Sequence, residues 1–545
     1  MEIEMMETWS LSIDFGSVRD NYGTPLYIFN PEQLRKNISE FLTFVHEPKN
    51  IAFPIKALPV PPVLHLMALA GLSADCASPA EIELALGAGF PAHRIFYNSP
   101  EIIVPSALNL LKNGGTLVLN DTNDVPRFIG KQNGSIYLRW NPGVASGYTA
   151  PYTNLTCHGH RQSQFGSSTE AILSMPKEWL CHINGLHTHI GSRMISIDDF
   201  SLALERMHSL ADTIFATTGH QILQLNMGGG LKLAMNHQDN CPSIIDLTTA
   251  LNRLARKGTR YIVEPGNSLT GNTMGILTTV SHIKNRPDGG RFAILDTGSN
   301  QLLKYTLSGI QPTILNDTGL PLPFEGPDAV AGPLCFAGDV LLPNTCIDNI
   351  RPGMPLLIQH CGAYCLALSS QFNGRFRPAI LSISPDGSWN KIQEEENSWL
   401  TMLSSSELPW NSDFFDMVEC QNITRTSLQH IPVDVISVFQ TGPRSICFML
   451  IVKDHINTLS AFEFILLLIR HAMNCLNINK SGTEPDGVTL LPALNSSLIK
   501  GKTQSIYISA GYETNQGIQI NIGKKNQLLG FCRLGKDPSA AHDSG

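Results

Sequence analysis

The sequence predicts an α/β protein whose largest part is a (β/α)8 barrel, followed by an antiparallel β domain and an appended α+β region. Eight short β-rich runs separated by helix-like stretches lie between about residues 50 and 265. After about residue 290 the runs are separated by Gly, Pro and Asn turns, and a third pattern begins near residue 406. Strands that alternate with helices form parallel βαβ units, and eight such units close into a barrel.

The eight predicted barrel strands are separated by turns and amphipathic segments. Residues 79–89 (PAEIELALGAG) illustrate one such helix, because apolar residues alternate with Glu81 and Glu83 before a terminal glycine. The longest gap, between Trp140 and Ile183, carries a polar loop. The strands are predicted at residues 51–55, 72–76, 94–98, 116–120, 135–140, 183–190, 222–228 and 260–264.

The same patterns divide the chain into four segments. The apolar run at residues 26–29 precedes the barrel and is expected to join the β domain. In the last segment a strand at 447–452 precedes a helix at 460–476, and strand-like runs follow at 505–511 and 517–523. We predict an N-terminal segment at 1–45, the barrel at 46–288, the β domain at 289–405 and the appended region at 406–545.

Composition narrows the class of protein. Apolar residues make up 42% of the 545 residues and charged residues 15%, which excludes a disordered, collagenous or coiled-coil chain. The net charge is −8 without a basic block, which argues against a nucleic-acid partner. The N-terminus lacks an apolar core and the longest apolar run, from Phe462 to Ile469, is too short to cross a bilayer. We therefore expect no membrane association, and a cytoplasmic protein whose twelve cysteines are reduced.

Residues with useful chemistry follow five of the predicted strands. Lys56 follows the first, Asp75 ends the second, His189 the sixth, Gly228–Gly230 the seventh and Glu264 the eighth. Barrel active sites form where the carboxyl ends of the strands meet. A lysine can form a Schiff base, glycine N–H groups can approach a phosphate, a carboxylate can keep a pyridine nitrogen protonated, and a histidine can stack on a ring. Together these groups predict a pyridoxal 5'-phosphate site.

Each of these features also has an ordinary structural explanation when it is taken alone. A lysine after a strand is usually a solvated charge, and histidines in a half-buried strand usually have their hydrogen bonds satisfied. A glycine triplet is more often a flexible turn than a phosphate site. Their convergence on one rim of an independently predicted barrel favours the cofactor site.

At these residues the chain resembles the fold-type-III pyridoxal-phosphate decarboxylases, the group of diaminopimelate and ornithine decarboxylases, and is most similar to diaminopimelate decarboxylase. The resemblance runs in family order over about residues 10–400. It implies an alanine-racemase-like barrel plus a β domain. The matching stretches are YGTPLYIF, FPIKA, SADCASPAEIELALGAGF, GLHTHIGS, LNMGGGL, VEPG, GPLCFAGDVL, GAY and NGRFRPA.

The resemblance also assigns roles to residues. It implies that Lys56 forms the Schiff base, that His189 stacks on the cofactor ring and that Glu264 pairs with the pyridine nitrogen. Asp75 would support the site from the second strand. Cys335 would reach the site of a partner subunit and take part in protonation, so Lys56, His189 and Cys335 are the predicted catalytic residues. The resemblance places Ser192, Gly228, Gly229, Gly230, Gly266 and Tyr364 around the phosphate or the adjacent substrate.

Several positions depart from the family pattern where the substrate would bind. Asn267 stands where the family has Arg, and Phe336 where it has an acidic residue. An ungapped match puts Lys304 and Ser308 at the positions of the Arg and Tyr that grip a distal carboxylate, and Gln164 replaces the Lys of KFG. The resemblance therefore implies retained cofactor chemistry with an altered substrate-binding group, so we expect a substrate other than diaminopimelate.

Two further patterns are weaker. The Cys and His residues within 157–160 and 360–365 lack a second ligand pair at zinc-like spacing, so we predict no metal site. His455 resembles the His of the HxxxDG segment in carrier-dependent condensation and acetyl-transfer enzymes, but Leu459 and Ser460 replace its Asp and Gly. We therefore expect the appended region to be an inert appendage, or else a docking or dimer-extending module, rather than an acyltransferase.

These observations predict a pyridoxal-phosphate-dependent carboxy-lyase that removes the α-carboxylate of a small-molecule amino acid. The expected assembly is a homodimer with shared sites, and a carrier protein that presents the amino acid is a further candidate partner. Two alternatives stay open: a non-catalytic or carrier-dependent homologue, and an amino-acid racemase on the same barrel. Retention of Lys56, His189 and Glu264 argues against a pure binding protein, and the Cys335 segment fits decarboxylases better than racemases.

Overall fold

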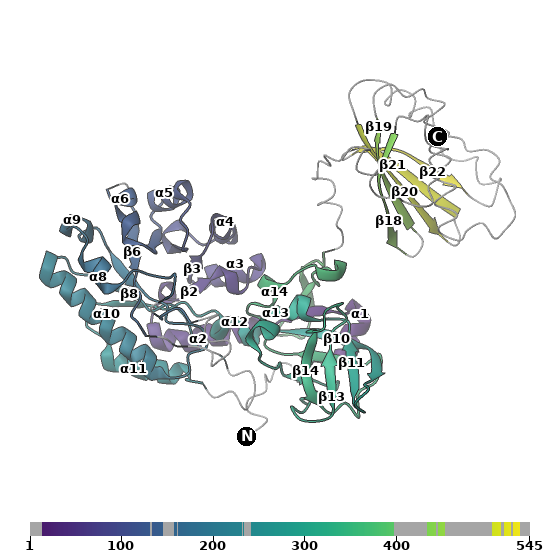
Figure 1. Cartoon of the computed structure of the whole chain (residues 1–545), viewed down its shortest axis with the longest axis horizontal. Coiled ribbons are helices and arrows are strands. Elements are labelled where there is room, and N and C mark those ends of the chain that lie inside the picture. The colour runs from purple at the N-terminus through teal and green to yellow at the C-terminus, as the bar shows by residue number, and fades with distance from the viewer. Residues whose placement is uncertain are drawn as a thin grey trace. The chain divides into compact units, whose positions relative to one another are not determined.

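The computed structural model describes residues 13–130, 133–144, 146, 157–160, 162–231, 233 and 241–396, together with five later strands. The chain divides into two compact units, Met1–Asn397 and Ser398–Gly545 (Figure 1). The first unit holds a parallel barrel and a second, mixed sheet, and the second unit holds one antiparallel sheet.

The eight parallel strands of the first unit form a barrel that closes on itself. Ala52 N donates to Val263 O at 2.9 Å and Val263 N donates to Asn50 O at 3.0 Å, which joins the first edge to the last. The strands follow one another in sequence order, as predicted. They are β2 (Ala52–Pro54), β3 (Ser73–Cys76), β4 (Ile95–Asn98), β5 (Thr116–Leu119), β6 (Ser135–Arg139), β7 (Gly185–His187), β8 (Gln224–Asn226) and β9 (Arg260–Ile262).

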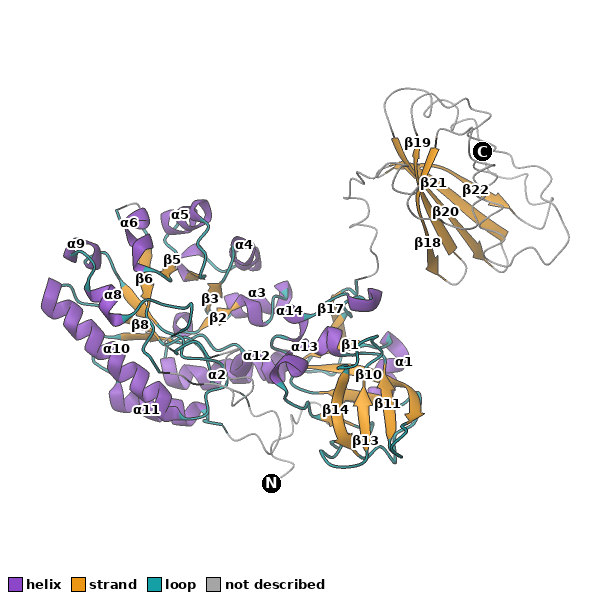
Figure 2. Cartoon of the chain, in the orientation of Figure 1, coloured by secondary structure: helices purple, strands orange, loops and turns teal. Residues whose placement is uncertain are grey.

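Helices lie on the outside of the barrel (Figure 2). Helix α10 shows why they form: the Ser196 side chain accepts from Asp198 N at its start, and Gly219, with φ 75°, ends it. Leu204 and Met207, three residues apart, are buried on its inner face. The helices are α2 (Pro31–Val45), α3 (Pro61–Leu69), α4 (Pro79–Ala88), α5 (Val104–Lys112), α6 (Val125–Phe128), α8 (Thr169–Leu173), α9 (Lys177–Leu180), α10 (Ile197–Thr218), α11 (Ile244–Leu254) and α12 (Asn267–Thr270).

Aromatic side chains fill the interior of the barrel. The rings of Phe96 on β4 and Tyr137 on β6 meet edge to face, with centroids 5.8 Å apart. The Tyr137 hydroxyl donates to Gln224 Oε1 at 2.7 Å, so its buried polar atom is satisfied. Since neighbouring strands contribute to one packed cluster, the interior is a solid core beneath the strand ends and not a channel. The cluster is completed by Ala52, Val118 and Ile262.

The second sheet of this unit is mixed, which corrects the predicted antiparallel domain. β1 pairs with β16 in parallel, and β11 pairs with β13 in parallel. Parallel neighbours need a crossover connection, and helix α13 (Ser299–Ser308) lies in the one between β11 and β13. The sheet contains β1 (Leu26–Phe29), β10 (Met274–Asn285), β11 (Arg291–Leu295), β12 (Ile314–Leu315), β13 (Asp328–Ala331), β14 (Val340–Thr345), β15 (Pro355–Ile358), β16 (Ile380–Ile383) and β17 (Trp389–Gln393).

The N-terminal segment contributes to both parts of this unit. β1 lies between β10 and β16 in the second sheet, as predicted for residues 26–29, and helix α1 (Phe15–Tyr22) contacts β10 and β15. Helix α2 instead packs against α11 and α12 of the barrel. β10 pairs with β1, β11 and β15 rather than with β9, so the change from barrel to second sheet falls before Met274 and not at residue 288.

The second unit contains a five-stranded antiparallel sheet in sequence order. The strand-like runs predicted at 447–452, 505–511 and 517–523 lie in its second, third and fourth strands. His455 and the helix predicted at 460–476 lie outside the described residues. The strands are β18 (Val433–Gly442), β19 (Ser445–Val452), β20 (Gln504–Glu513), β21 (Gly517–Lys524) and β22 (Gln527–Leu534).

No helix in the described part of the chain combines the length and the apolar character that crossing a membrane requires.

Candidate active site

Lys56 and Asp75 form an ion pair at the mouth of the barrel. Lys56 lies in a short 3-10 turn, η3 (Ile55–Ala57), directly after β2, and its Nζ lies 2.9 Å from Asp75 Oδ2 on β3. The lysine side chain is 47% exposed and the aspartate is fully buried. Burial opposes the lysine charge, but Asp75, Tyr364 and Glu264 outweigh it and raise the pKa of Lys56 above its usual value. The amine is therefore protonated, and it donates a hydrogen bond to the Asp75 carboxylate.

Glu264 follows β9 and is held by two side chains from neighbouring strands. Its Oε1 accepts from Asn226 Nδ2 at 2.8 Å, and its Oε2 lies 3.3 Å from His187 Nε2. Burial raises the pKa of this carboxyl, but His187, Lys56 and the Asn226 amide outweigh burial and leave the pKa below its usual value. A buried carboxylate that stays ionised in this way can keep a ring nitrogen protonated.

His187 and Asn226 were not predicted from the sequence, although each had a signal. His187 lies two residues before His189, and Asn226 is the last residue of β8, immediately before Met227 and the glycine triplet. Asn98 Nδ2 lies 3.3 Å from His187 Nε2, so β4 also contributes to this network. A polar residue at the end of a buried barrel strand is therefore a signal for a side chain that supports the residues of the site.

The glycine triplet lets three strand ends approach one another. Gly228 and Gly230 have φ values of +67° and +114°, which favour glycine. A Cβ on Gly229 would lie 2.4 Å from Glu264 O, and one on Gly230 would lie 2.4 Å from Gly191 O. Because no side chain covers the backbone of this turn, its N–H groups can be approached closely, which fits the phosphate end of pyridoxal phosphate, as the resemblance implied.

His189 projects from the end of β7 next to this turn. Its Nδ1 accepts from Gly229 N at 3.2 Å, which favours the tautomer protonated at Nε2. Burial first, and then the neighbouring His158 and Arg139 groups, lower the pKa of His189 well below its usual value. A neutral imidazole suits stacking on a protonated pyridine ring, since two cations would repel each other.

The second sheet reaches the same place through the loop between β15 and α14 (Cys365–Leu368). Tyr364 N donates to Ala57 O at 2.8 Å, directly beside Lys56. A Cβ on Gly266 would lie 2.7 Å from Tyr364 Oη, so the phenol contacts the turn after Glu264. The structure thus brings Lys56, Asp75, His189, Gly228, Gly229, Gly230, Glu264, Gly266 and Tyr364 together, with Ser192 half-buried in the loop after His189.

The residues predicted to bind substrate are arranged differently. Lys304 Nζ donates to His360 O at 2.6 Å and lies 4.8 Å from the centroid of Tyr305. Ser308 is buried and its hydroxyl donates to Tyr305 O at 3.3 Å. Asn267 begins α12, and its Oδ1 is buried with no hydrogen-bond partner among the described residues. Lys304 and Ser308 are thus engaged within the second sheet and its helix α13.

Cys335 and Phe336 occupy an exposed turn between β13 and β14. Asn373 Oδ1 accepts from Cys335 N at 2.8 Å, and the Phe336 ring is 47% exposed above Gly338. The buried Asp339 carboxylate accepts from Leu334 N at 2.9 Å and so fixes the base of the turn. The turn is therefore held in shape while both side chains point to solvent in a single chain.

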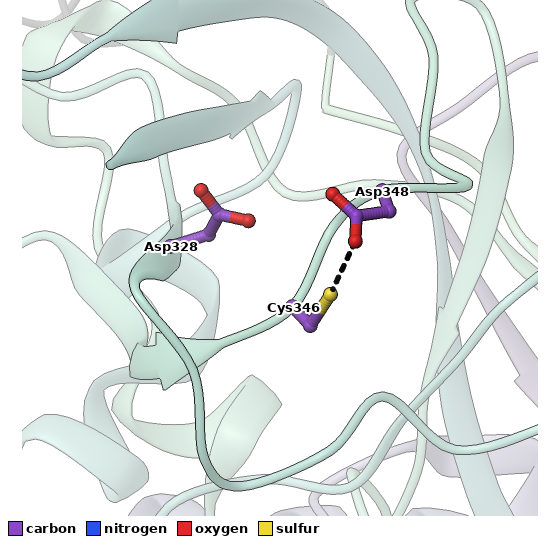
Figure 3. Close-up of side chains that lie close together, drawn as sticks. All are labelled: Asp328, Cys346 and Asp348. Atoms are coloured by element: carbon purple, nitrogen blue, oxygen red, sulfur yellow. Dashed lines mark hydrogen bonds between the residues drawn. The ribbon is translucent and has the colours of Figure 1, made fainter. Parts of the chain in front are cut away.

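One group of described residues has the spacing of metal ligands: Asp328, Cys346 and Asp348 (Figure 3). The guanidinium of Arg291 lies 2.7 Å from Asp328 Oδ2 and 2.6 Å from Asp348 Oδ1. The Cys346 thiol donates to Asp348 Oδ2 at 3.1 Å, so its hydrogen-bonding capacity is satisfied within the protein. Because Arg291 already forms ion pairs with both carboxylates, we interpret the cluster as an ion-pair network beside β13.

These features define a pyridoxal-phosphate-dependent enzyme: a closed parallel barrel carries at one rim an ion-paired lysine, an ionised buried carboxylate and the glycine turn 228–230, which we call the glycine cradle. The family model described as "Pyridoxal-dependent decarboxylase, pyridoxal binding domain" matches residues 32–271. Diaminopimelate decarboxylase of Aquifex aeolicus is 29% identical over 406 residues, 71% of this chain and 92% of that protein. The enzyme of the same name from Methanothermobacter thermautotrophicus is 28% identical over 400 residues, 70% of this chain and 92% of that protein.

Solved structures agree with these sequence matches. A crystal structure of an Aquifex aeolicus protein has a TM-score of 0.64 at 25% identity, over 73% of this chain and 95% of that one. Helicobacter pylori diaminopimelate decarboxylase in complex with L-lysine has a TM-score of 0.63 at 23% identity, over 70% and 96%. The latter shows the shared fold, an alanine-racemase-like barrel with a separate mixed sheet.

Residues 32–271 match the pyridoxal-dependent decarboxylase family, and the chain is similar to the diaminopimelate and ornithine decarboxylase group of fold-type-III enzymes. It is a pyridoxal-phosphate-dependent amino-acid decarboxylase, and the resemblance drawn from its motifs is confirmed. The comparisons do not favour the two alternatives, a non-catalytic or carrier-dependent homologue and a racemase.

Substituting Gly229 by Ala should abolish retention of pyridoxal phosphate, because the new Cβ would lie 2.4 Å from Glu264 O and force the strand ends apart. Overpacking of this kind costs roughly 1–3 kcal/mol of stability. Cofactor absorbance after gel filtration and a thermal melt measure both effects. Gly87→Ala is the matched control, since a Cβ there meets nothing within 4 Å, and it should bind cofactor normally. Undiminished cofactor retention by Gly229→Ala would contradict the prediction that the glycine turn binds the cofactor.

Proposed function

We propose that Lys56, Asp75, His189 and Glu264 are the residues that carry out decarboxylation in this chain. The observation that carries the proposal is the geometry of Glu264, an ionised carboxylate held by His187 and Asn226 at the same rim as the Lys56–Asp75 pair. Bound pyridoxal phosphate supplies a ring that accepts the electron pair left when the α-carboxylate departs. Glu264 would hold a proton on that ring's nitrogen.

The other residues would bind the cofactor and manage protons. Lys56 must lose its proton before it can react with an aldehyde, and Asp75 Oδ2, 2.9 Å away, is placed to accept it. Burial and the nearby Glu264 raise the pKa of Asp75, although Lys56 opposes the shift, so Asp75 is a better base than an exposed aspartate. The neutral His189 ring would cover one face of the cofactor, and Tyr364 would close the site from the second sheet.

The proposed role of Lys56 is tested by reduction with hydride in the presence of pyridoxal phosphate. We expect visible absorbance from the bound cofactor, and after reduction a cofactor-labelled peptide that contains Lys56. Lys56→Ala should lose both signals, while Lys49→Ala, a lysine paired with Glu47 at the surface, should keep both. A label that maps to another lysine would show that the assignment of Lys56 is wrong.

We further propose that the preferred substrate lacks the distal charges of diaminopimelate. Lys304 already donates to His360 O and Ser308 to Tyr305 O, while Phe336 presents an apolar ring. A substrate charge that loses water without gaining a partner costs several kcal/mol. An uncharged amino acid, free or tethered to a carrier protein, is therefore the substrate class that these residues suit best.

Comparison of kcat/KM for diaminopimelate, lysine, ornithine and uncharged amino acids tests this substrate preference. We expect an uncharged amino acid to exceed diaminopimelate, since a site without partners for buried charges can discriminate by about 10⁴-fold. Phe336→Glu should increase the relative kcat/KM of substrates with a distal ammonium, whereas Phe372→Glu, at another exposed phenylalanine, should not. A wide preference of the unmodified enzyme for diaminopimelate would refute the proposal.

We also propose a cytoplasmic homodimer with shared active sites. The Cys335–Phe336 turn is exposed in one chain and rigidly held, which suits a group that acts in a partner's site. In the described part of the first unit the cysteine side chains are not joined to one another in disulfides, which suits a reducing compartment. Closed two-fold dimers are the commonest soluble oligomers.

Mixing two inactive variants, Lys56→Ala and Cys335→Ala, tests the shared site. If Cys335 acts across the interface, each heterodimer contains one site with both groups intact, so activity should recover to about a quarter of the wild-type level after random exchange. Subunit exchange is checked with differently tagged chains. Mixing Lys56→Ala with Lys56→Arg serves as the control and should recover nothing. Confirmed exchange without recovery would exclude catalysis by Cys335 in trans.

A further inference from the structure

A second histidine from the loop between β6 and α8 lies against His189. The rings of His158 and His189 have centroids 4.7 Å apart and are tilted by 46°. His158 is half-buried, and Lys56 is close enough to influence its charge. In the sequence this histidine stands out only as part of a weak metal-binding pattern, so its contact with His189 comes from the fold.

The contact with His189 ends a continuous series of packed groups. Phe165 meets His158 with ring centroids 4.6 Å apart, and the guanidinium carbon of Arg139 lies 4.4 Å from the Phe165 centroid. Arg139 is buried at the end of β6. Cation–π and tilted aromatic contacts of this kind are attractive and depend on ring geometry. The series therefore links the rigid strand β6 to the ring at the end of β7.

The backbone of the loop fixes the place of His158. Gly159 N donates to Ile190 O at 3.1 Å, and a Cβ on Gly159 would lie only 1.7 Å from Val144 O. Asn141 Nδ2 donates to His160 O at 3.0 Å. Only glycine allows this approach, so the loop presents His158 to the end of β7 in one position.

The imidazole of His158 is neutral and poorly solvated. Its Nδ1 is buried and has no hydrogen-bond partner among the described residues. Burial first, and then the Arg139 and Lys56 charges, lower the pKa of His158 to about 4. A buried polar atom without a partner is costly, which indicates a role other than stability. The titratable groups that face His158 and His189 are Lys56 on η3, Arg139 on β6, His160 in the loop and His187 on β7.

We propose that His158 is a positioning residue, whose ring contact holds the His189 imidazole in the plane in which it packs against the cofactor ring. This inference rests on the proposed function, in which His189 covers the cofactor. Among the described residues, the His189 ring is held by the hydrogen bond from Gly229 N to its Nδ1, and a single bond leaves the ring free to turn about it. The His158 ring removes that freedom and keeps water from the back of His189.

The test compares three full-length variants by titration with pyridoxal phosphate and by visible circular dichroism of the bound cofactor. His158→Ala should bind the cofactor about 3- to 10-fold more weakly, the loss of one aromatic contact, and should lose most of the dichroism signal. His158→Phe keeps a ring and should resemble the wild type. His160→Ala is the matched control: it removes a neighbouring histidine of the same loop, whose Nδ1 accepts from Gln162 N, and leaves the ring contact between His158 and His189 in place.

A pH series gives a second readout. Water that replaces the His158 ring should raise the pKa of His189 towards its ordinary value of about 6.5. Protonated His189 would then repel a protonated cofactor ring, so His158→Ala should release cofactor as pH falls from 8 to 6. The wild type, whose His189 stays neutral across that range, should retain it. Far-UV circular dichroism at each pH excludes unfolding.

The outcomes separate this inference from the function on which it rests. If the wild type fails to bind pyridoxal phosphate at Lys56, the proposed function is wrong. If the wild type binds it and folded His158→Ala matches the wild type in affinity and dichroism, only the positioning role is excluded. Loss of dichroism in folded His158→Phe as well would also overturn the proposal, because the ring contact alone would then be insufficient.

Discussion

The stabilisation of the buried Glu264 carboxylate by its neighbours is the interaction on which the rest of the candidate active site depends. Removed from water, it would take up a proton unless neighbouring groups stabilised its charge, and His187 and Asn226 do so at 3.3 and 2.8 Å. These partners belong to β7 and β8, where they are register neighbours across the sheet, and Asn226 is paired with Ile262 on β9. A parallel barrel in this register is therefore a condition for an ionised Glu264.

The second sheet completes the rim of the barrel through Tyr364, and it also carries the exposed turn that contains Cys335. Tyr364 is bonded through its backbone to Ala57, so the turn that carries Lys56 is supported from both parts of the first unit. The Cys335 turn of the same sheet is exposed but braced by Asn373 and Asp339. These two contacts limit the conformational freedom of the turn, although its side chains are exposed.

Much of this arrangement was predictable from local patterns. Short β-rich runs separated by helices predicted the eight strands, and the carboxyl ends of such strands meet at one rim, which grouped Lys56, His189 and Glu264 correctly. The sheet after the barrel was predicted to be antiparallel, which is wrong, because β1 and β16 pair in parallel from opposite ends of the first unit. Strand direction between segments so distant in sequence depends on the path of everything between them.

The sequence by itself determined the class of chemistry, since a lysine, a carboxylate and a glycine triplet after successive barrel strands must converge. Only the tertiary structure decided which partners those groups meet. His187 and Asn226 resemble ordinary strand residues until β7 and β8 bring them to Glu264. Lys304 aligned with a substrate-binding position, yet its ammonium donates to His360 O. The physical reason is that hydrogen bonds and charge pairs act over about 3 Å, whereas the partners lie many residues apart, so packing alone selects them.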